Sequence, residues 1–200
     1  MSMTMATPRT RSLATALFAT LVCLTVACGG SGGGGGGGSG PNPAPPSFVA
    51  GFSADEPNPG NLTVSMAEAS GGGDQVTVAV NVTGTNDVYG SELTVLFDPA
   101  SVAFVSRSAG TLLESGGYSV IYEDALISPG RLLVSATRFN AVPDGADVSS
   151  SEPLVQLTFR ATSAGTSSVS FENVLLLDSQ PPAPAPIPGL SWFGGTLVAN

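Results

Sequence analysis

Hydrophobic and polar residues alternate along most of the chain after residue 60, with a period of two instead of the 3.6 of a helix. The clearest segment is Gln75–Gly84, in which Val76, Val78, Val80 and Val82 share one side and small or polar residues share the other. This alternation predicts a half-buried strand of an antiparallel sheet, with the valines in the core.

Two more segments repeat the alternation, and weaker versions fill the gaps between them. In Tyr89–Phe97 we expect Leu93, Val95 and Phe97 to point inward, against Glu92, Thr94 and Leu96. Leu154–Ala161 has the same pattern. The weaker candidate strands are Leu62–Ala67, Val102–Ser106, Tyr118–Glu123, Leu132–Phe139, Ser167–Phe171, Val174–Leu177 and Gly195–Ala199.

Glycine- and proline-containing turns separate these segments, and helix is limited to a turn near 98–102 or 110–115. About nine short strands in about 140 residues predict an all-β fold, an antiparallel β-sandwich with jelly-roll topology. Asp98-Pro99 is expected to end a strand and open a turn. Gln180–Gly189 contains five prolines, so it is expected to be an extended excursion before the last strand.

The first 27 residues have the pattern of an export signal. Leu13–Ala27 is an uncharged stretch that follows a positively charged start, and it is too short for a membrane-spanning helix of about 20 residues. Its end at Ala27-Cys28 resembles a bacterial lipobox, which implies lipid attachment at Cys28. The alternative is an ordinary secretory signal cut after Ala27, which would leave a free thiol.

The segment that follows has the composition of a tether. Residues 29–40 are ten glycines and two serines, and Pro41–Pro46 is a stiffer proline-rich spacer. We therefore divide the chain into a signal peptide (1–27), a lipid-attached tether (28–60) and one folded domain (61–200). The resulting expectation is an exported bacterial lipoprotein, anchored to the outer membrane or the cell surface.

Composition excludes several classes of function. Beyond residue 27 there are 15 acidic and 4 basic residues, a formal charge of −11, so no phosphate-contacting nucleic-acid binder is expected. The chain contains no His and no Lys, and both cysteines precede the predicted domain. His- and Lys-dependent catalysis and His zinc sites are thereby excluded, so neither a cofactor nor an enzyme is expected.

The order of the predicted elements resembles the cohesin domain, a nine-stranded jelly-roll module that captures dockerin modules. The resemblance spans about residues 61–199. It is carried by four stretches: an opening strand and glycine turn before the valine strand, Val88–Pro99 with its Phe-Asp-Pro ending, the strands Gly130–Ala136 and Leu154–Phe159, and the closing Phe193–Val198.

The resemblance implies a partner, a dockerin-bearing protein that carries its own calcium, docked on one flat sheet face. By the same resemblance the outward residues of two strands would form that face: Glu92 and Thr94 on one, Ala136 and Arg138 on the other. Gly90 replaces a polar residue that the family often has just before the acidic position. The alternative is that Glu92 and Arg138 are ordinary solvated charges.

Three other candidate sites are weaker. The acidic loop Pro143–Glu152 has carboxylates but no EF-hand spacing, so a solvated loop is favoured over a Ca²⁺ site and no metal is expected. Trp192, Tyr118 and Tyr122 are candidates for a sugar-stacking platform, against ordinary core or edge packing. A pair of glycosidase carboxylates is not indicated by any spacing.

The function that these observations favour is non-catalytic docking at the cell surface, with an expected link to polysaccharide breakdown. The alternative is a carbohydrate-binding or adhesive β-sandwich module of the cell envelope, and the third possibility is a purely structural envelope protein. Dockerin binding would support the first, and retention on insoluble polysaccharide the second.

Overall fold

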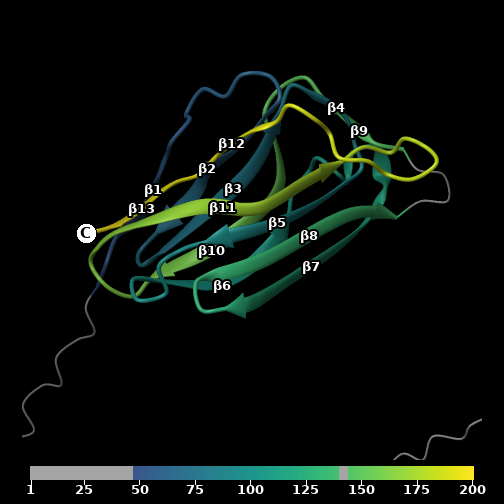
Figure 1. Ribbon diagram of the computed structural model, residues 1–200. Coiled ribbons are helices and arrows are strands. Elements are labelled where there is room, and N and C mark those ends of the chain that lie inside the picture. The colour runs from purple at the N-terminus through teal and green to yellow at the C-terminus, as the bar shows by residue number, and fades with distance from the viewer. Residues whose placement is uncertain (1–46, 140–143) are drawn as a thin grey trace, which may run out of the picture. The chain divides into compact units, whose positions relative to one another are not determined.

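The computed structural model describes residues 47–139 and 144–200. Within these ranges the secondary structure is β-strands and one short 3₁₀ turn, η1 (Ser115–Gly117), and no described segment forms a helix long and apolar enough to cross a membrane. The strands are β1 (Ala50–Ala54), β2 (Thr63–Gly72), β3 (Gln75–Thr83), β4 (Thr85–Val88), β5 (Gly90–Leu96), β6 (Val102–Ala109), β7 (Ser119–Ser128), β8 (Arg131–Phe139), β9 (Ala146–Val148), β10 (Glu152–Ala161), β11 (Gly165–Leu177), β12 (Ser191–Phe193) and β13 (Gly195–Ala199) (Figure 1).

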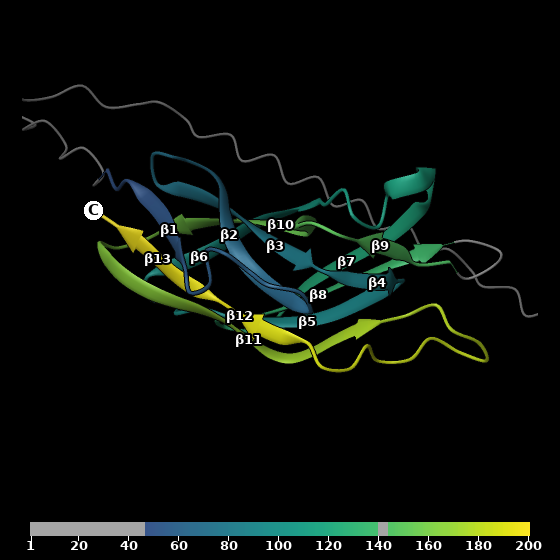
Figure 2. The same cartoon turned by 90° about the horizontal axis from the view of Figure 1, so that it is seen from above.

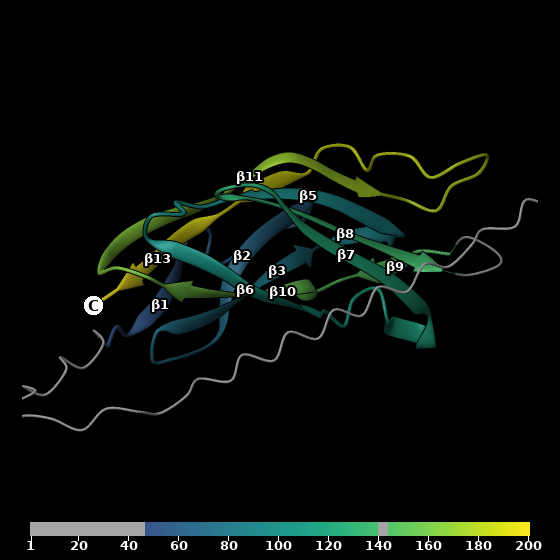
Figure 3. The same ribbon diagram turned by 90° about the horizontal axis from the view of Figure 1, so that it is seen from below.

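The strands form two sheets that face each other across the hydrophobic core (Figures 2 and 3). The first sheet has the order β1-β13-β11-β5-β8-β7, and the second has the order β12-β2-β3-β10-β6. A two-stranded ribbon of β4 and β9 lies at one end. Among the described strands only β12 and β2 pair in parallel. The prediction of an all-β, antiparallel jelly-roll sandwich is confirmed.

The core is built from the inward residues of both sheets, as the alternation predicts. Val76, Val78, Val80 and Val82 on β3 are each at most 1 % exposed. The largest fully buried side chain is Phe159. The rings of Phe97 and Phe104 meet Phe159 edge-on, with ring centres 5.5 and 6.1 Å from its own. Burying such a ring contributes about 2–3 kcal/mol, so this aromatic group is a major link between the sheets.

Most predicted strands are present, but their number and joins differ from expectation. Ser167–Phe171 and Val174–Leu177 belong to one strand, β11, in which a bulge at Asn173 (φ +47°) shifts the pairing with β5. Four further strands, β1, β4, β9 and β12, have only three to five residues. Segments this short cannot show a convincing alternation, which is why the pattern missed them.

The folded part begins earlier than residue 61. Strand β1 pairs with β13 along its whole length, and the backbone N–H of Phe52 donates to Glu68 at 2.6 Å. The Phe52 ring lies so close to Gly195 that a Cβ there would come within 2.3 Å of it. The expected tether of 28–60 therefore overlaps the sandwich at its C-terminal end, whereas Cys28 lies outside the described residues.

The predicted turn at Asp98-Pro99 is confirmed. The Asp98 carboxylate accepts hydrogen bonds from the backbone N–H of Ala100 and the hydroxyl of Ser101, both at 3.0 Å. The expected excursion at Gln180–Gly189 is also present, and almost all of its residues are exposed. Figure 2 shows this yellow segment extending beyond the end of β11 before it returns to β12.

Candidate functional site

The first sheet has one side against the core and one side in solvent, and β8 shows which residues belong to each. Leu132, Val134, Ala136 and Arg138 are each at most 2 % exposed, whereas the residues between them are partly exposed. The expectation that Ala136 and Arg138 lie on the outward face is therefore wrong. Both share the parity of Leu132 and Val134, so the alternation that buries those residues buries them too.

Arg138 has a structural environment that satisfies its buried charge. Its guanidinium donates to the backbone oxygens of Leu113 (2.8 Å), Ser115 (2.9 Å) and Asp144 (3.1 Å), and to the Ser115 hydroxyl (2.8 Å). It also lies over the Tyr118 ring, 4.4 Å from its centre. A buried cation needs such partners, and Arg138 thereby joins the end of β8 to the segment around η1.

Strand β5 places Glu92 and Thr94 on the outward side, as expected. Glu92 is exposed, but Thr94 is only 3 % exposed although it shares that face. Thr94 lies between Leu133 of β8 and Glu172 of β11, its direct partners on the two flanking strands. Glu92 is therefore available to a partner protein, whereas Thr94 is nearly covered within the sheet.

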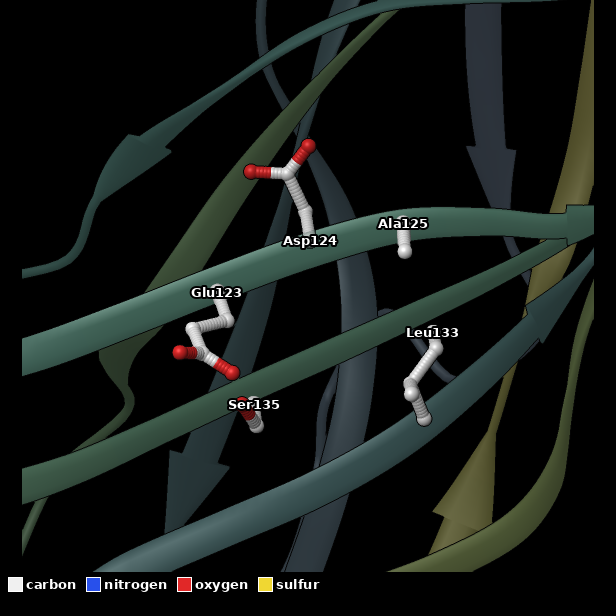
Figure 4. A pocket seen from close by; sticks show the side chains of 5 residues that line it. All are labelled: Glu123, Asp124, Ala125, Leu133 and Ser135. Carbon is white, nitrogen blue, oxygen red and sulfur yellow. The ribbon is translucent and has the colours of Figure 1, made fainter. Parts of the chain in front are cut away.

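The register of three strands places two carboxylates in one row. Glu92 pairs with Ser135, and Ser135 pairs with Glu123 on β7, so the two glutamates are separated by two strand spacings, about 10 Å. Figure 4 shows Glu123 directed toward Ser135, with Asp124 directed the other way. Ala125 and Leu133 complete a shallow hollow of about 330 Å³. We call Glu123, Ser135 and Glu92 the acidic row.

Apolar side chains flank the acidic row. Ile121 is 53 % exposed and pairs with Thr137, one row along the strands, and Phe139 at the end of β8 is 69 % exposed. Leu175 and Leu177 on β11 are half-buried on the same side. The outward residues of β7, β8, β5 and β11 thus form a mixed acidic and apolar surface, which we call the outer face.

The outer face carries no free cation in the described part of the chain. Of the outward residues Arg131 is the basic one, and it pairs with Glu172. The other arginines are also engaged: Arg107 with Asp124 at 2.9 Å, Arg160 with Asp74 at 3.8 Å, and Arg138 in its buried site. The acidic row therefore gives this face a negative potential that neighbouring charges do not cancel.

The family model described as the cohesin domain matches residues 60–182, well over half of the chain.

The chain belongs to the cohesin domain family.

Solved structures agree on the fold of this cohesin domain. The sixth cohesin of scaffoldin B from Acetivibrio cellulolyticus, solved with a Cel5 dockerin mutant, is 20 % identical over 73 % of this chain and 96 % of that chain, with a TM-score of 0.51. A type II cohesin dyad from the adaptor scaffoldin of the same organism is 19 % identical over 68 % and 48 %, with a TM-score of 0.53. A type II cohesin–X–dockerin complex from that organism is 16 % identical over 65 % and 92 %, with a TM-score of 0.50. No curated protein matches the chain.

The three aromatic residues considered for sugar stacking do not share a surface in this cohesin domain. Trp192 lies on β12, an edge of the second sheet, and packs edge-on against Phe171 at 5.4 Å. Tyr122 lies on β7, an edge of the first sheet, and its hydroxyl donates to the backbone oxygen of Gly110. Tyr118 precedes β7 and covers Arg138. Packing, the alternative stated for these residues, accounts for all three.

Two of the three carboxylates of the acidic loop accept hydrogen bonds from elsewhere in the domain. Asp144 accepts the hydroxyl of Tyr118, and this bond, with the negative charge of Asp144, raises the pKa of Tyr118 above its ordinary value. Asp147 accepts the backbone N–H of Asp87 at 3.0 Å, and Glu152 lies in β10. Within residues 47–139 and 144–200 no three metal-binding side chains gather into a group.

Two residues, one on the outer face and one beside it, were missed by sequence reasoning. Glu123 was recognised only as the end of a candidate strand, because the register that places it beside Ser135 is a cross-strand property. The second is Asp87, whose carboxylate accepts the backbone N–H groups of Gly145 and Ser179 and the side chains of Ser179 and Gln180. Asp87 adopts a left-handed conformation (φ +59°), which marks an unusual turn in the structure, but no feature of the sequence reveals it.

Proposed function

We propose that this cohesin domain is a non-catalytic docking module, and that a dockerin-bearing protein binds to its outer face. Family membership supports this proposal, as do the related cohesins that were solved in complex with dockerins. A link to polysaccharide breakdown is part of the proposal, through the enzymes that such a partner would carry.

The observation that carries the proposal is the exposed acidic row beside apolar side chains. Glu92 and Glu123 have no ion-pair partner among the described residues, and the Ser135 hydroxyl lies between them. Ile121, one row from the acidic row, and Phe139, two rows from it, are both more than half exposed. Large exposed apolar residues beside hydrogen-bonding groups are typical of protein interfaces. The apolar side chains contribute buried area to the complex, and the hydrogen bonds fix the orientation of the partner.

The composition of the chain supports the non-catalytic part of the proposal. The sequence has no His and no Lys, which removes the commonest general bases and nucleophile activators. The two carboxylates of the acidic row lie on an open sheet face, whereas paired catalytic acids act across a cleft that holds the substrate. The acidic row is therefore better suited to accepting hydrogen bonds from a partner than to bond cleavage.

The proposal is tested by titrating the chain from residue 28 onward, with Cys28→Ser, against a panel of calcium-loaded dockerin modules. The panel contains dockerin modules from the organism that encodes this chain and, in addition, the Cel5 dockerin of A. cellulolyticus. We expect at least one tight complex, and a loss of about tenfold or more in affinity for Glu92→Ala. Asp55→Ala, which removes an exposed acid outside the outer face, is the control and should leave affinity unchanged.

Two other outcomes would contradict the proposed docking site. If a dockerin binds but Glu92→Ala and Asp55→Ala bind it equally well, the interface lies on another surface of the domain. If no module of the panel binds, docking itself is wrong.

We also propose that the domain is presented at the cell surface through a lipid on Cys28. The lipobox-like sequence, the Gly/Ser segment and the proline-rich spacer support this proposal by composition. The test is expression in a bacterial host with a radiolabelled fatty acid. Label on the wild-type chain, and none on Cys28→Ser, is expected. A labelled Cys28→Ser chain, or an unlabelled wild-type chain recovered in the soluble fraction, would contradict the lipid anchor.

A further inference from the structure

The proline-rich segment after β11 returns along that strand and adds an arm to the first sheet. Leu177 pairs antiparallel with Pro186. The backbone N–H of Ile187 donates to the oxygen of Leu176, and the N–H of Asp178 donates to the oxygen of Ala185, at 2.8 and 2.9 Å. We call residues 185–187 the arm. At this end of the sheet the arm occupies the position beside β11 that β13 occupies at the other end.

The arm places Pro186 on the outer face. Direct cross-strand partners point to the same side of a sheet, and Leu177 is the partner of both Gly90 and Pro186. Ile187, the next residue, packs against the core instead. The continuous row across five segments is Ile121, Thr137, Gly90, Leu177 and Pro186. We call it the apolar row.

The middle of the apolar row is flat, because Gly90 has no side chain and is buried under its neighbour. A Cβ on Gly90 would lie 3.1 Å from the Thr137 hydroxyl and 3.2 Å from the backbone oxygen of Ala136, so the Thr137 side chain lies against it. Leu177 and Pro186 lie on one side of this flat stretch, and Ile121 lies on the other. Because adjacent rows are about 7 Å apart along the strands, the stretch lies one row from Glu92.

The base of the arm is held in place by Asp87. Its carboxylate accepts the amide of Gln180 at 2.7 Å and the backbone N–H of Ser179 at 3.3 Å, and it also accepts the N–H of Gly145 at 3.1 Å. Asp178 links the two ends of the excursion, because its carboxylate accepts the backbone N–H of Ala185 at 2.9 Å. The exposed proline-rich segment is thus fixed to the sheet by several hydrogen bonds, and binding there needs little ordering of the chain.

We propose that the arm widens the docking face and that the apolar row selects among dockerins. Apolar side chains of the partner would rest on the flat stretch of the apolar row, against Ile121 on one side and against Leu177 and Pro186 on the other, while groups that donate hydrogen bonds reach the acidic row. This inference rests on the proposed function, because it names the part of the same face that decides which dockerin binds. The partner class is a dockerin with an apolar residue about 7 Å from its donor group.

The experiment uses the chain from residue 28 onward, with Cys28→Ser, and the same calcium-loaded dockerin panel. Pro186→Glu places a carboxylate on the apolar row, and Ala183→Glu adds the same charge to an exposed position of the same segment outside the arm. We expect Pro186→Glu to weaken the tightest complex about tenfold or more, and Ala183→Glu to leave it within about twofold. Pro186→Ala, which trims the ring without adding charge, is expected to weaken it about threefold and to change the order of preference within the panel.

The outcomes separate this inference from the proposed function. If dockerins bind and lose affinity for Glu92→Ala, but Pro186→Glu and Pro186→Ala bind like the wild type, the arm has no role in selection and the inference is wrong while docking stands. If Pro186→Glu and Ala183→Glu weaken binding equally, the effect is one of net charge and the inference is again wrong. If the wild type binds no dockerin, both fail together. Thermal unfolding of each variant confirms that the compared proteins are folded.

Discussion

The guanidinium of Arg138 lies 4.4 Å from the centre of the Tyr118 ring, and this pair closes one end of the first sheet. Arg138 is 2 % exposed, so removing it leaves buried carbonyl oxygens without a donor. We expect Arg138→Ala to lower the free energy of unfolding by about 3 kcal/mol, measured by urea denaturation. Arg138→Lys should not restore it, because one ammonium group cannot reproduce the planar set of donors.

The matched control for Arg138 is Arg160, whose side chain is 49 % exposed and lies 3.8 Å from Asp74. Arg160→Ala should cost at most about 1 kcal/mol. Equal costs for the two substitutions would contradict the structural role of Arg138.

The acidic row makes docking sensitive to salt. Glu92 and Glu123 lie on an exposed face without a free cation among the described residues, so a bound partner is expected to place positive or hydrogen-bond-donating groups against them. Affinity for a dockerin should therefore fall as NaCl is raised from about 50 mM to 500 mM, because the Debye length shrinks from about 14 to 4 Å. The measurement is a titration series by calorimetry.

The double variant Glu92→Gln, Glu123→Gln keeps the size of both side chains and removes both charges. It should bind with a clearly flatter salt dependence than the wild type. An unchanged slope would show that the attraction comes from charges elsewhere.

The strand pattern predicted the sandwich, but it did not predict which residues form the outer face. Alternation alone identifies which residues of one strand share a side, and it correctly placed Glu92 outward. On β8 the same rule was available, since Leu132 and Arg138 are six residues apart and must share a side. The family resemblance instead placed Ala136 and Arg138 on the docking face, and both are buried. The burial of Arg138 depends on acceptors at Leu113, Ser115 and Asp144, from other parts of the chain, and no local pattern shows them.

Other parts of the site depend on pairing between distant segments. Glu123 and Glu92 become neighbours only through the register of β7, β8 and β5, and Pro186 reaches the face only because residues 185–187 pair with β11. A proline-rich segment predicts an excursion, but its docking depends on Asp87, more than ninety residues before Gln180. Register and long-range hydrogen bonds are properties of the folded chain, so one sequence does not reveal them.

Asp87 is expected to make stability depend on pH. Burial raises the pKa of this carboxyl, but the hydrogen bonds from Ser179, Gln180 and Gly145 lower it by more, so the folded-state pKa lies below the ordinary value of 3.8. The unfolded chain therefore takes up a proton more readily, and the stabilisation from Asp87 is present above about pH 4 and is lost as pH falls through the folded-state pKa.

The variant Asp87→Asn tests this dependence, since Asn also accepts the left-handed conformation at this position. It should be less stable than the wild type by about 1 kcal/mol or more at pH 6, because the hydrogen bonds then have a neutral acceptor. The difference between the two proteins should shrink between pH 4 and pH 2.5. A difference that stays constant over this range would mean that the Asp87 charge does not stabilise the fold.

The start of the folded domain is testable by truncation. A chain of residues 47–200 retains β1, whereas a chain of residues 61–200 loses its five backbone pairings with β13 and the Phe52 ring that covers Gly195. Losing a partly buried aromatic ring and one strand at the edge of the sheet should cost about 3 kcal/mol or more, which corresponds to a Tm lower by about 10 °C for a domain of this size. Differential scanning calorimetry of the two chains measures this difference. Substituting Phe52→Ala in the longer chain separates the ring from the strand, and it should account for about half of the loss. Equal Tm values for the two chains would place β1 outside the cooperative unit, and the domain would then begin near residue 61 after all.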